Sequence, residues 1–174
     1  MNVIQTHLTL PEGWTKGAVM ALISEVAPLI GLSPARLAVL NYIIGRTRAS
    51  DWTSPHREPV FFGAQDLAAV ELGKTSRQLR TDEAALAKLG LIVKRVAANG
   101  ARYGRAGLGL ILTPLIARLE EFIALRDRLR AERRHLRALK DLRSLRLRHM
   151  KRCIAALPSS ATKDPEVADI LARY

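Results

Sequence analysis

Polar and basic side chains cluster at the start of a helix that the sequence predicts near the middle of the chain. They are Ser76, Arg77, Gln78, Arg80 and Thr81. Arginine donates two parallel hydrogen bonds to guanine, and glutamine pairs in the same way with adenine, so this set could read base edges in the major groove of DNA. Lys74 and Thr75 lie just before it, at the positive end of the helix dipole, where a phosphate is favoured.

Two helices joined by a tight turn are expected to position these groups. Residues 65–72 predict a short helix that Gly73 closes. Thr75 and Gln78 then have the spacing of a capping box, in which the hydroxyl and the amide satisfy free backbone groups at a helix start. This cap competes with any base contact by Gln78. Residues 76–89 form the second helix, whose buried face is expected to consist of Leu79, Leu86 and Leu89.

A β-hairpin is predicted to follow the second helix. Residues 91–96 and 107–112 have the composition of two paired strands, and Asn99-Gly100 between them is a hairpin signal. Residues 60–62 could add a short third strand. The loop of the hairpin carries three side chains that can reach the DNA backbone or the minor groove, namely Arg102, Tyr103 and Arg105.

The order helix, turn, helix, strand, loop, strand predicts a winged helix-turn-helix, whose second helix enters the major groove of DNA. The alternative is that Arg77 and Arg80 form only a solvated helix face and that the wing touches nothing.

The predicted fold class is mainly α with a small β wing, in four parts. Residues 1–62 form a helical N-terminal part packed on the winged unit, and residues 63–114 form the winged helix-turn-helix core. Residues 115–157 form a long arginine-rich helix, and residues 158–174 form a linker and a short amphipathic helix.

Two helices and a loop are predicted within the N-terminal part. Residues 14–29 carry apolar side chains at helical spacing. Ser33-Pro34 marks the start of a second helix, with a capping residue followed by proline at the first helical position. Residues 49–59 are rich in proline and polar side chains, which predicts a loop.

The long helix is predicted to begin at Thr113-Pro114, with Thr113 as its cap, and to run without a break to Leu157. This stretch holds 13 Lys or Arg residues against 5 Asp or Glu residues. A regular heptad seam fails at three charged positions, Glu132, Arg143 and Arg146. Acid–base pairs one turn apart would steady the helix, such as Arg128–Glu132 and Arg137–Asp141.

The two halves of this helix are expected to have different roles. The first half, through Leu129, should pack on the winged unit, because its apolar residues are densest there. The second half either pairs with another copy of the chain or lies along DNA phosphates. The final helix carries an apolar stripe that docks on something or begins a further domain, and its members are Val167, Ile170, Leu171 and Tyr174.

The composition is strongly basic. The chain of 174 residues has 28 Lys or Arg and 16 Asp or Glu residues, for a net charge of +12. A clustered positive charge of this size favours a polyanionic partner. Cys153 is the single cysteine, so an internal disulfide is excluded and a reducing compartment is indicated. The sequence has neither a signal-peptide pattern nor an apolar run of membrane-spanning length, so the cytoplasm is the expected location.

Catalytic, cofactor and metal sites are not expected. Gly73-Lys74-Thr75 resembles the end of a phosphate-binding loop, but Ala68 stands where that motif requires glycine, and a helix precedes it instead of a strand. The four histidines lie on separate elements without a second ligand at metal spacing. Cys153 is expected to be a buried helix residue without a nearby histidine, the alternative being a thiol of low pKa.

The chain resembles the N-terminal part of the RepC family, the replication initiators of repABC-type plasmids in alpha-proteobacteria. The winged region followed by Leu-Thr-Pro-Leu and an arginine-rich helix is the most specific part of the resemblance. The matching blocks are Gly13-Trp14, Gly31-Leu32-Ser33, Asp51-Trp52-Thr53, Arg77-Gln78-Leu79-Arg80, Leu89-Gly90-Leu91-Ile92, Ala98-Asn99-Gly100-Ala101-Arg102, Leu112-Thr113-Pro114-Leu115 and Ala131-Glu132-Arg133-Arg134.

The resemblance implies sequence-specific binding of double-stranded DNA at a plasmid origin. Because the chain has no NTP-binding motif and no catalytic constellation, we expect no enzymatic activity and recruitment of host replication proteins. A single winged domain buries only about 600–1,000 Å² on DNA, which suggests a homodimer or a cooperative multimer. Family members are more than twice as long, so the chain is either an N-terminal fragment or a naturally short relative. We expect it to occupy the origin without initiating replication unaided, and to inhibit a full-length relative. Two alternatives are a winged-helix transcriptional regulator and a protein that binds a partner through the long helix.

Overall fold

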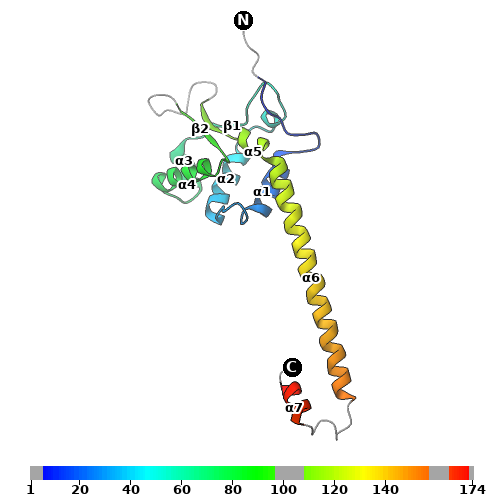
Figure 1. The fold of residues 1–174 in the computed structure, drawn as a ribbon. Helices are drawn as coiled ribbons and strands as arrows, with labels where there is room; N and C mark the ends of the chain where they lie inside the picture. The colour runs from blue at the N-terminus through cyan, green and yellow to red at the C-terminus, as the bar shows by residue number, and fades with distance from the viewer. Residues whose placement is uncertain (1–5, 97–107, 157–164, 173–174) are drawn as a thin grey trace. The chain divides into compact units, whose positions relative to one another are not determined.

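The computed structural model of the chain describes residues 6–96, 108–156 and 165–172. Residues 1–129 form one compact unit and residues 130–174 form another. The described part is mainly helical, with one three-stranded antiparallel sheet in the first unit (Figure 1). The predicted content of helices with a small β portion is therefore confirmed.

The first unit begins with two α-helices, α1 (Lys16–Val26) and α2 (Pro34–Gly45). The N-terminus of α1 is capped by Thr15, whose hydroxyl accepts a hydrogen bond from the Ala18 N–H at 3.2 Å. Ser33 occupies the predicted capping position of α2, although its side chain makes no capping hydrogen bond. The two helices pack on each other through their apolar faces.

The segment predicted as a plain loop contains a 3₁₀ helix, η1 (Ala49–Trp52). Trp52 is fully buried, and its indole N–H donates to Thr47 Oγ1 at 2.9 Å. Burial of a large indole whose single donor is satisfied holds this segment against the core. The polar and proline-rich composition conceals this role, because the anchoring hydrogen bonds involve Thr47, in the turn after α2, and the Leu10 N–H, which donates to the Trp52 carbonyl at 2.8 Å.

Helices α3 (Gln65–Glu71) and α4 (Ser76–Lys88) are the predicted helix pair, and they lie side by side (Figure 1). Gly73, in the turn between them, has φ +62°, a left-handed conformation that glycine adopts without strain. Leu79 and Leu86 are buried as predicted, whereas Leu89 lies just beyond the end of α4 and is only half-buried.

The sheet consists of β1 (Val60–Phe61), β2 (Val93–Arg95) and β3 (Gly109–Ile111), in the order β1-β3-β2. Ile111 is the register partner of Val60 on one side and of Val93 on the other. The third strand predicted near residue 60 is therefore present, and the strands of the predicted hairpin pair as expected but are shorter. Residues 97–107, which include the Asn-Gly signal, lie outside the described residues.

The long helix is not continuous from Thr113, in contrast to the prediction. A short helix, α5 (Thr113–Ala117), ends at Arg118, and α6 (Leu119–Ala155) begins directly after it. Arg118 turns away from the helix path with φ −100° and ψ 10°, and its guanidinium donates to the Leu89 carbonyl at 2.6 Å. Leu112, and not Thr113, occupies the capping position of α5.

The start of α6 belongs to the core of the first unit. Leu119 and Phe122 are buried, and Leu125 packs against the same apolar cluster. That cluster also contains Val19 and Ile23 of α1 and side chains from α2, α4, β3 and α5. The apolar residues of the first three turns of α6 therefore anchor the helix in this unit.

The second unit contains the rest of α6 and the short helix α7 (Pro165–Ala172). From Arg130 to Ala155 every side chain is exposed, apart from the half-buried Leu147, Met150 and Ile154. The apolar stripe predicted for α7 and the linker before it lie outside the part whose side chains the structure describes. In the described residues, no helix combines the length and the apolar character needed to cross a membrane.

We predict that Gly109→Ala destabilises the first unit by about 2 kcal/mol or more. Gly109 has φ +140°, and an added Cβ would lie 2.5 Å from the carbonyl oxygen of Phe61 on the paired strand. Urea denaturation followed by circular dichroism measures the change. The control is Gly45→Ala at the end of α2, where a Cβ meets nothing within 4 Å; alanine should there raise stability by about 0.5 kcal/mol. Equal stability of both variants would contradict the close approach of β1 and β3.

Candidate nucleic-acid interface

The predicted capping box at the start of α4 is present with both of its hydrogen bonds. Thr75 Oγ1 accepts from the Gln78 N–H at 3.2 Å, and Gln78 Oε1 accepts from the Thr75 N–H at 2.9 Å. These bonds satisfy two of the backbone donors that a helix start leaves free. Thr75 and Gln78 are exposed but committed to the cap through their oxygen atoms, so they fix the direction in which the first turn of α4 faces.

Arg77 is the most available of the predicted DNA-binding side chains. It is exposed, and within the described residues its guanidinium makes neither an ion pair nor a hydrogen bond. Thr81, one turn later, is also exposed, and its hydroxyl donates to the Arg77 carbonyl at 3.1 Å. Among the described residues none uses the five donors of the Arg77 guanidinium, so these donors can serve an external acceptor.

Two other predicted contact residues are tied to α3. Ser76 Oγ donates to Asp66 Oδ1 at 2.6 Å, and Arg80 Nε donates to Gln65 Oε1 at 3.3 Å. The Arg80 bond uses only one of the guanidinium donors, so the exposed Arg80 keeps its outer nitrogens. These bonds fix α4 against α3, which the sequence prediction did not include.

Lys74 is already neutralised within the chain. Its ammonium lies 2.6 Å from Asp82 Oδ2, and the second oxygen of that carboxylate lies 3.6 Å from Arg36 Nε of α2. The predicted phosphate contact of Lys74 must therefore compete with Asp82. Lys74 and Asp82 are eight residues apart in the sequence, too far for a pair on one helix face, so local spacing does not reveal this interaction.

A charged pair joins the back of α4 to the sheet. Glu83 is buried, and its Oε2 lies 3.0 Å from Lys94 Nζ on β2. The burial of Glu83 was not predicted, although the sequence carries a signal for it. Glu83 falls four residues after Leu79 and three before Leu86, on the buried stripe. A charge at that position requires a partner. The pair aligns α4 with the strand that leads into the predicted wing loop.

The three predicted wing contacts, Arg102, Tyr103 and Arg105, lie outside the described residues. The structure therefore places seven of the ten predicted DNA-binding residues, all around the start of α4. Contact of these residues with DNA stays a prediction.

Arg118 connects the end of α4 to the start of α6. It forms a two-bond ion pair with Glu121, with both nitrogen–oxygen distances at 2.7 Å, and its guanidinium stacks 4.8 Å from the centre of the Phe122 ring. The hydrogen bonds from Arg118 hold the pKa of Glu121 below its ordinary value, and the same bonds raise the pKa of Arg118. The pair therefore keeps both charges while Arg118 donates to the Leu89 carbonyl.

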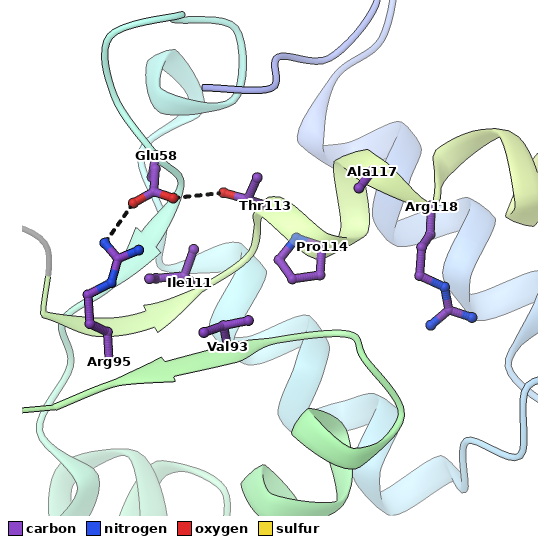
Figure 2. A pocket seen from close by; sticks show the side chains of 8 residues that line it. All are labelled: Glu58, Val93, Arg95, Ile111, Thr113, Pro114, Ala117 and Arg118. Atoms are coloured by element: carbon purple, nitrogen blue, oxygen red, sulfur yellow. Dashed lines mark hydrogen bonds and ion pairs between the residues drawn. The ribbon is translucent and has the colours of Figure 1, made fainter. Parts of the chain in front are cut away.

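A pocket of about 470 Å³ lies between the sheet and α5 (Figure 2). Its floor is apolar, formed by Val93, Ile111 and Pro114, and Arg118 lies at one end. At the other end Glu58 accepts hydrogen bonds from Arg95 at 2.9 Å and from the Thr113 hydroxyl at 3.4 Å. Glu58 thus connects the chain before β1 to β2 and α5, and its hydrogen bonds stabilise the arrangement of these three segments.

The prediction for Cys153 is wrong in two respects. The thiol is exposed, and its Sγ lies 3.7 Å from Nδ1 of His149, one turn earlier on α6. The four-residue spacing in the sequence was sufficient to predict this neighbour. In the described residues, no three His, Cys, Asp or Glu side chains form a group that could hold a metal ion.

The geometry defines a helix pair next to a small sheet, with an exposed arginine at the start of the second helix that makes no ion pair or side-chain hydrogen bond within the described residues. The model of the replication protein C N-terminal domain family matches residues 2–157. The chain therefore belongs to the replication protein C N-terminal domain family, as its resemblance to RepC predicted. No solved structure matches the chain.

Two rhizobial relatives share this similarity. A Rhizobium rhizogenes protein with the name "Putative replication protein C" is 30% identical over 141 residues, which are 76% of this chain and 35% of that protein. A protein of the same name from Sinorhizobium fredii (strain NBRC 101917 / NGR234) is 27% identical over 134 residues, 72% of this chain and 33% of that protein. The chain thus spans about a third of the length of these relatives.

We predict that Arg118→Ala raises the pKa of Glu121 towards that of a free glutamate, because the lost hydrogen bonds favour the ionised carboxylate. A carbon-13 NMR titration of the side-chain carboxyl measures this. The lowered pKa contributes stability above the ordinary carboxyl pKa, and this contribution is lost as the pH falls through the lowered value. The stability difference between wild type and Arg118→Ala should therefore shrink in acid. Arg126→Ala, which removes a pair with Asp127, should leave the Glu121 titration unchanged; a shift there would contradict the assignment.

Proposed function

We propose that the first unit is a winged helix-turn-helix that binds double-stranded DNA sequence-specifically at a plasmid replication origin, as the DNA-binding part of a replication initiator. The availability of Arg77 at the start of α4 is the observation that carries this proposal. The family assignment supports the link to replication. The proposed action is binding and recruitment of host replication proteins, without enzymatic activity or cofactor, on plasmid DNA in the cytoplasm.

The order of elements supports the winged helix-turn-helix proposal. Helix α2, strand β1, helices α3 and α4, and the antiparallel strands β2 and β3 follow one another in the chain. A second helix that extends from a tight turn with an exposed first turn is the form that enters the major groove in this class. The hairpin loop between β2 and β3 would be the wing.

In this proposal some side chains at the start of α4 contact the DNA and others hold the helix in position. Arg77 would make the two-bond contact to guanine, because its donors are free. Arg80 and Thr81 would contact neighbouring bases or phosphates from the same face. Thr75, Ser76 and Gln78 would hold the helix start in position, with Lys74 shared between Asp82 and a phosphate.

The overall charge supports a polyanionic partner. The chain has a net charge of +12, which raises the local concentration of an anionic ligand and speeds its association. Phosphate contacts would make the logarithm of the affinity fall by about 0.9 per neutralised phosphate with the logarithm of the salt concentration. This term supplies affinity without sequence preference, so specificity must come from the base contacts.

Arg77→Ala should weaken binding to the origin site by about 1–3 kcal/mol, roughly 5- to 150-fold, and should weaken binding to unrelated DNA much less. Footprinting on the parent replicon locates the site, and fluorescence anisotropy measures both affinities. The matched control is Arg57→Ala, which removes the same charge from an exposed position before β1. Equal losses on both DNAs would refute base recognition by Arg77. Protection confined to a promoter would favour a transcriptional regulator instead.

Asp82→Asn should strengthen binding to origin and unrelated DNA alike, by about 0.5–1 kcal/mol. The substitution releases Lys74 from its ion pair and makes its ammonium available to a phosphate. The salt dependence of the affinity should steepen in the same variant. Asp127→Asn on α6 changes the net charge by the same amount without touching Lys74. If both variants act equally, net charge alone controls the affinity and Lys74 has no direct role.

A further inference from the structure

An apolar and charged stripe on the second half of α6 is exposed and makes no ion pair or side-chain hydrogen bond within the described residues. Leu136 and Leu139 are 56% and 48% exposed. Glu132 and Arg143 flank them, and in the described part of the chain neither makes an ion pair or a side-chain hydrogen bond. The predicted pair of Glu132 with Arg128 is thus not formed. Exposed leucines at the centre of a solvated helix mark a surface for another molecule.

The four residues have the spacing of a helix–helix contact. The intervals from Glu132 to Leu136, Leu139 and Arg143 are four, three and four residues, which place them on one face with a period of 3.5. Polar residues at such seam positions lower the stability of a coiled coil but specify its register and orientation. Glu132 and Arg143, two of the three charges that interrupt the seam, therefore carry information about the partner.

We propose that two copies of the chain pair through this stripe in antiparallel orientation. A two-fold axis between residues 137 and 138 places Glu132 of one copy opposite Arg143 of the other, and Leu136 opposite Leu139. Each ion pair then occurs twice, and each charge is neutralised where the apolar residues exclude water. This isologous contact closes as a dimer.

Other arrangements of the same stripe are disfavoured by charge and by burial. Parallel pairing in register places Glu132 against Glu132 and Arg143 against Arg143, which is repulsive. A shift of the antiparallel register by one heptad places Glu132 opposite Leu136 in one direction, and Leu139 opposite Arg143 in the other. Either shift separates Glu132 from Arg143, whereas the proposed register pairs these two charges twice.

DNA is a poorer occupant of this stripe than a second copy. Phosphates would attract Arg143 but repel Glu132, and they would leave the two leucines uncovered. Most of the basic residues of the segment lie on other faces of the helix, among them Arg130, Arg134 and Arg137. Antiparallel pairing covers the leucines and leaves those arginines exposed. Because Arg133 and Lys140 flank the seam, pairing should be weak at low salt and should gain from screening.

The test measures self-association of the full 174-residue chain by sedimentation equilibrium at about 0.15 M salt. We expect the wild type to dimerise. Glu132→Arg and Arg143→Glu should each weaken the dimer by about tenfold or more, because each places like charges together twice. The double variant should recover an affinity within about threefold of wild type, because the opposite pairs are then restored. The experiment contains no DNA, so its outcome is independent of the proposed function.

Matched controls separate position from charge. Arg134→Glu and Asp141→Arg make the same two charge changes on the outer face of the helix, and they should leave the dimer unchanged. Cys153 reports orientation, because in the proposed dimer the two thiols are separated by 31 residues of helix axis, or about 46 Å at about 1.5 Å per residue. Mild oxidation should therefore form no disulfide within the dimer.

Three outcomes would overturn the proposal. The first is a wild-type chain that remains monomeric at the highest concentration measured. The second is a double variant that fails to recover, or a rapid Cys153 disulfide within the dimer, since both indicate parallel pairing. The third is dimerisation that is insensitive to Glu132 and Arg143. If a separate fluorescence anisotropy titration with DNA then gives equal losses for the Arg143 and Arg134 variants, the stripe is assigned to phosphates.

Discussion

Both edges of strand β3 are hydrogen-bonded, to β1 on one side and to β2 on the other. Leu110, Ile111 and Leu112 are buried, so the strand is also held from its faces. Helix α5 follows β3 directly in the chain. Helix α4 is joined by a short connection to β2, the strand that pairs with β3. The orientation of α4 and the position of the start of α6 thus both depend on β3. A displacement of β3 would move β1, β2 and the α5–α6 junction together.

Several acidic side chains of the first unit form ion pairs with basic side chains of the same unit. Asp82 holds Lys74 and Arg36, Glu83 holds Lys94, and Glu121 holds Arg118. These pairs set the positions of α4 and α6. In contrast, residues 130–155 contain 10 Lys or Arg and only 2 Asp or Glu. The positive excess of the chain therefore lies largely on the part of α6 that has few acidic residues to pair with.

Local sequence patterns predicted the helices and strands, whereas the predictions that were wrong depend on contacts between distant parts of the sequence. The capping box of Thr75 and Gln78 needs only neighbouring residues, so the start of α4 was predictable. The break at Arg118 depends on a hydrogen bond to Leu89, 29 residues earlier, and the anchoring of Trp52 includes a hydrogen bond from Leu10, at the N-terminal end of the described chain. The ion pair of Lys74 with Asp82 likewise requires the α3–α4 turn. For the candidate site, residue types on α4 were predictable, but which of them remain available was not.

The capping box has a consequence for how such a chain can diverge. Its hydrogen bonds involve only Thr75 and Gln78, and the buried Glu83 fixes the opposite face of α4. The frame of the helix start is therefore independent of the side chains that point outwards from it. Substitutions at Arg77 and Thr81 can accumulate without loss of these contacts. Under the proposed function, related replicons in one host would acquire separate target sequences through a few exchanges on an unchanged scaffold.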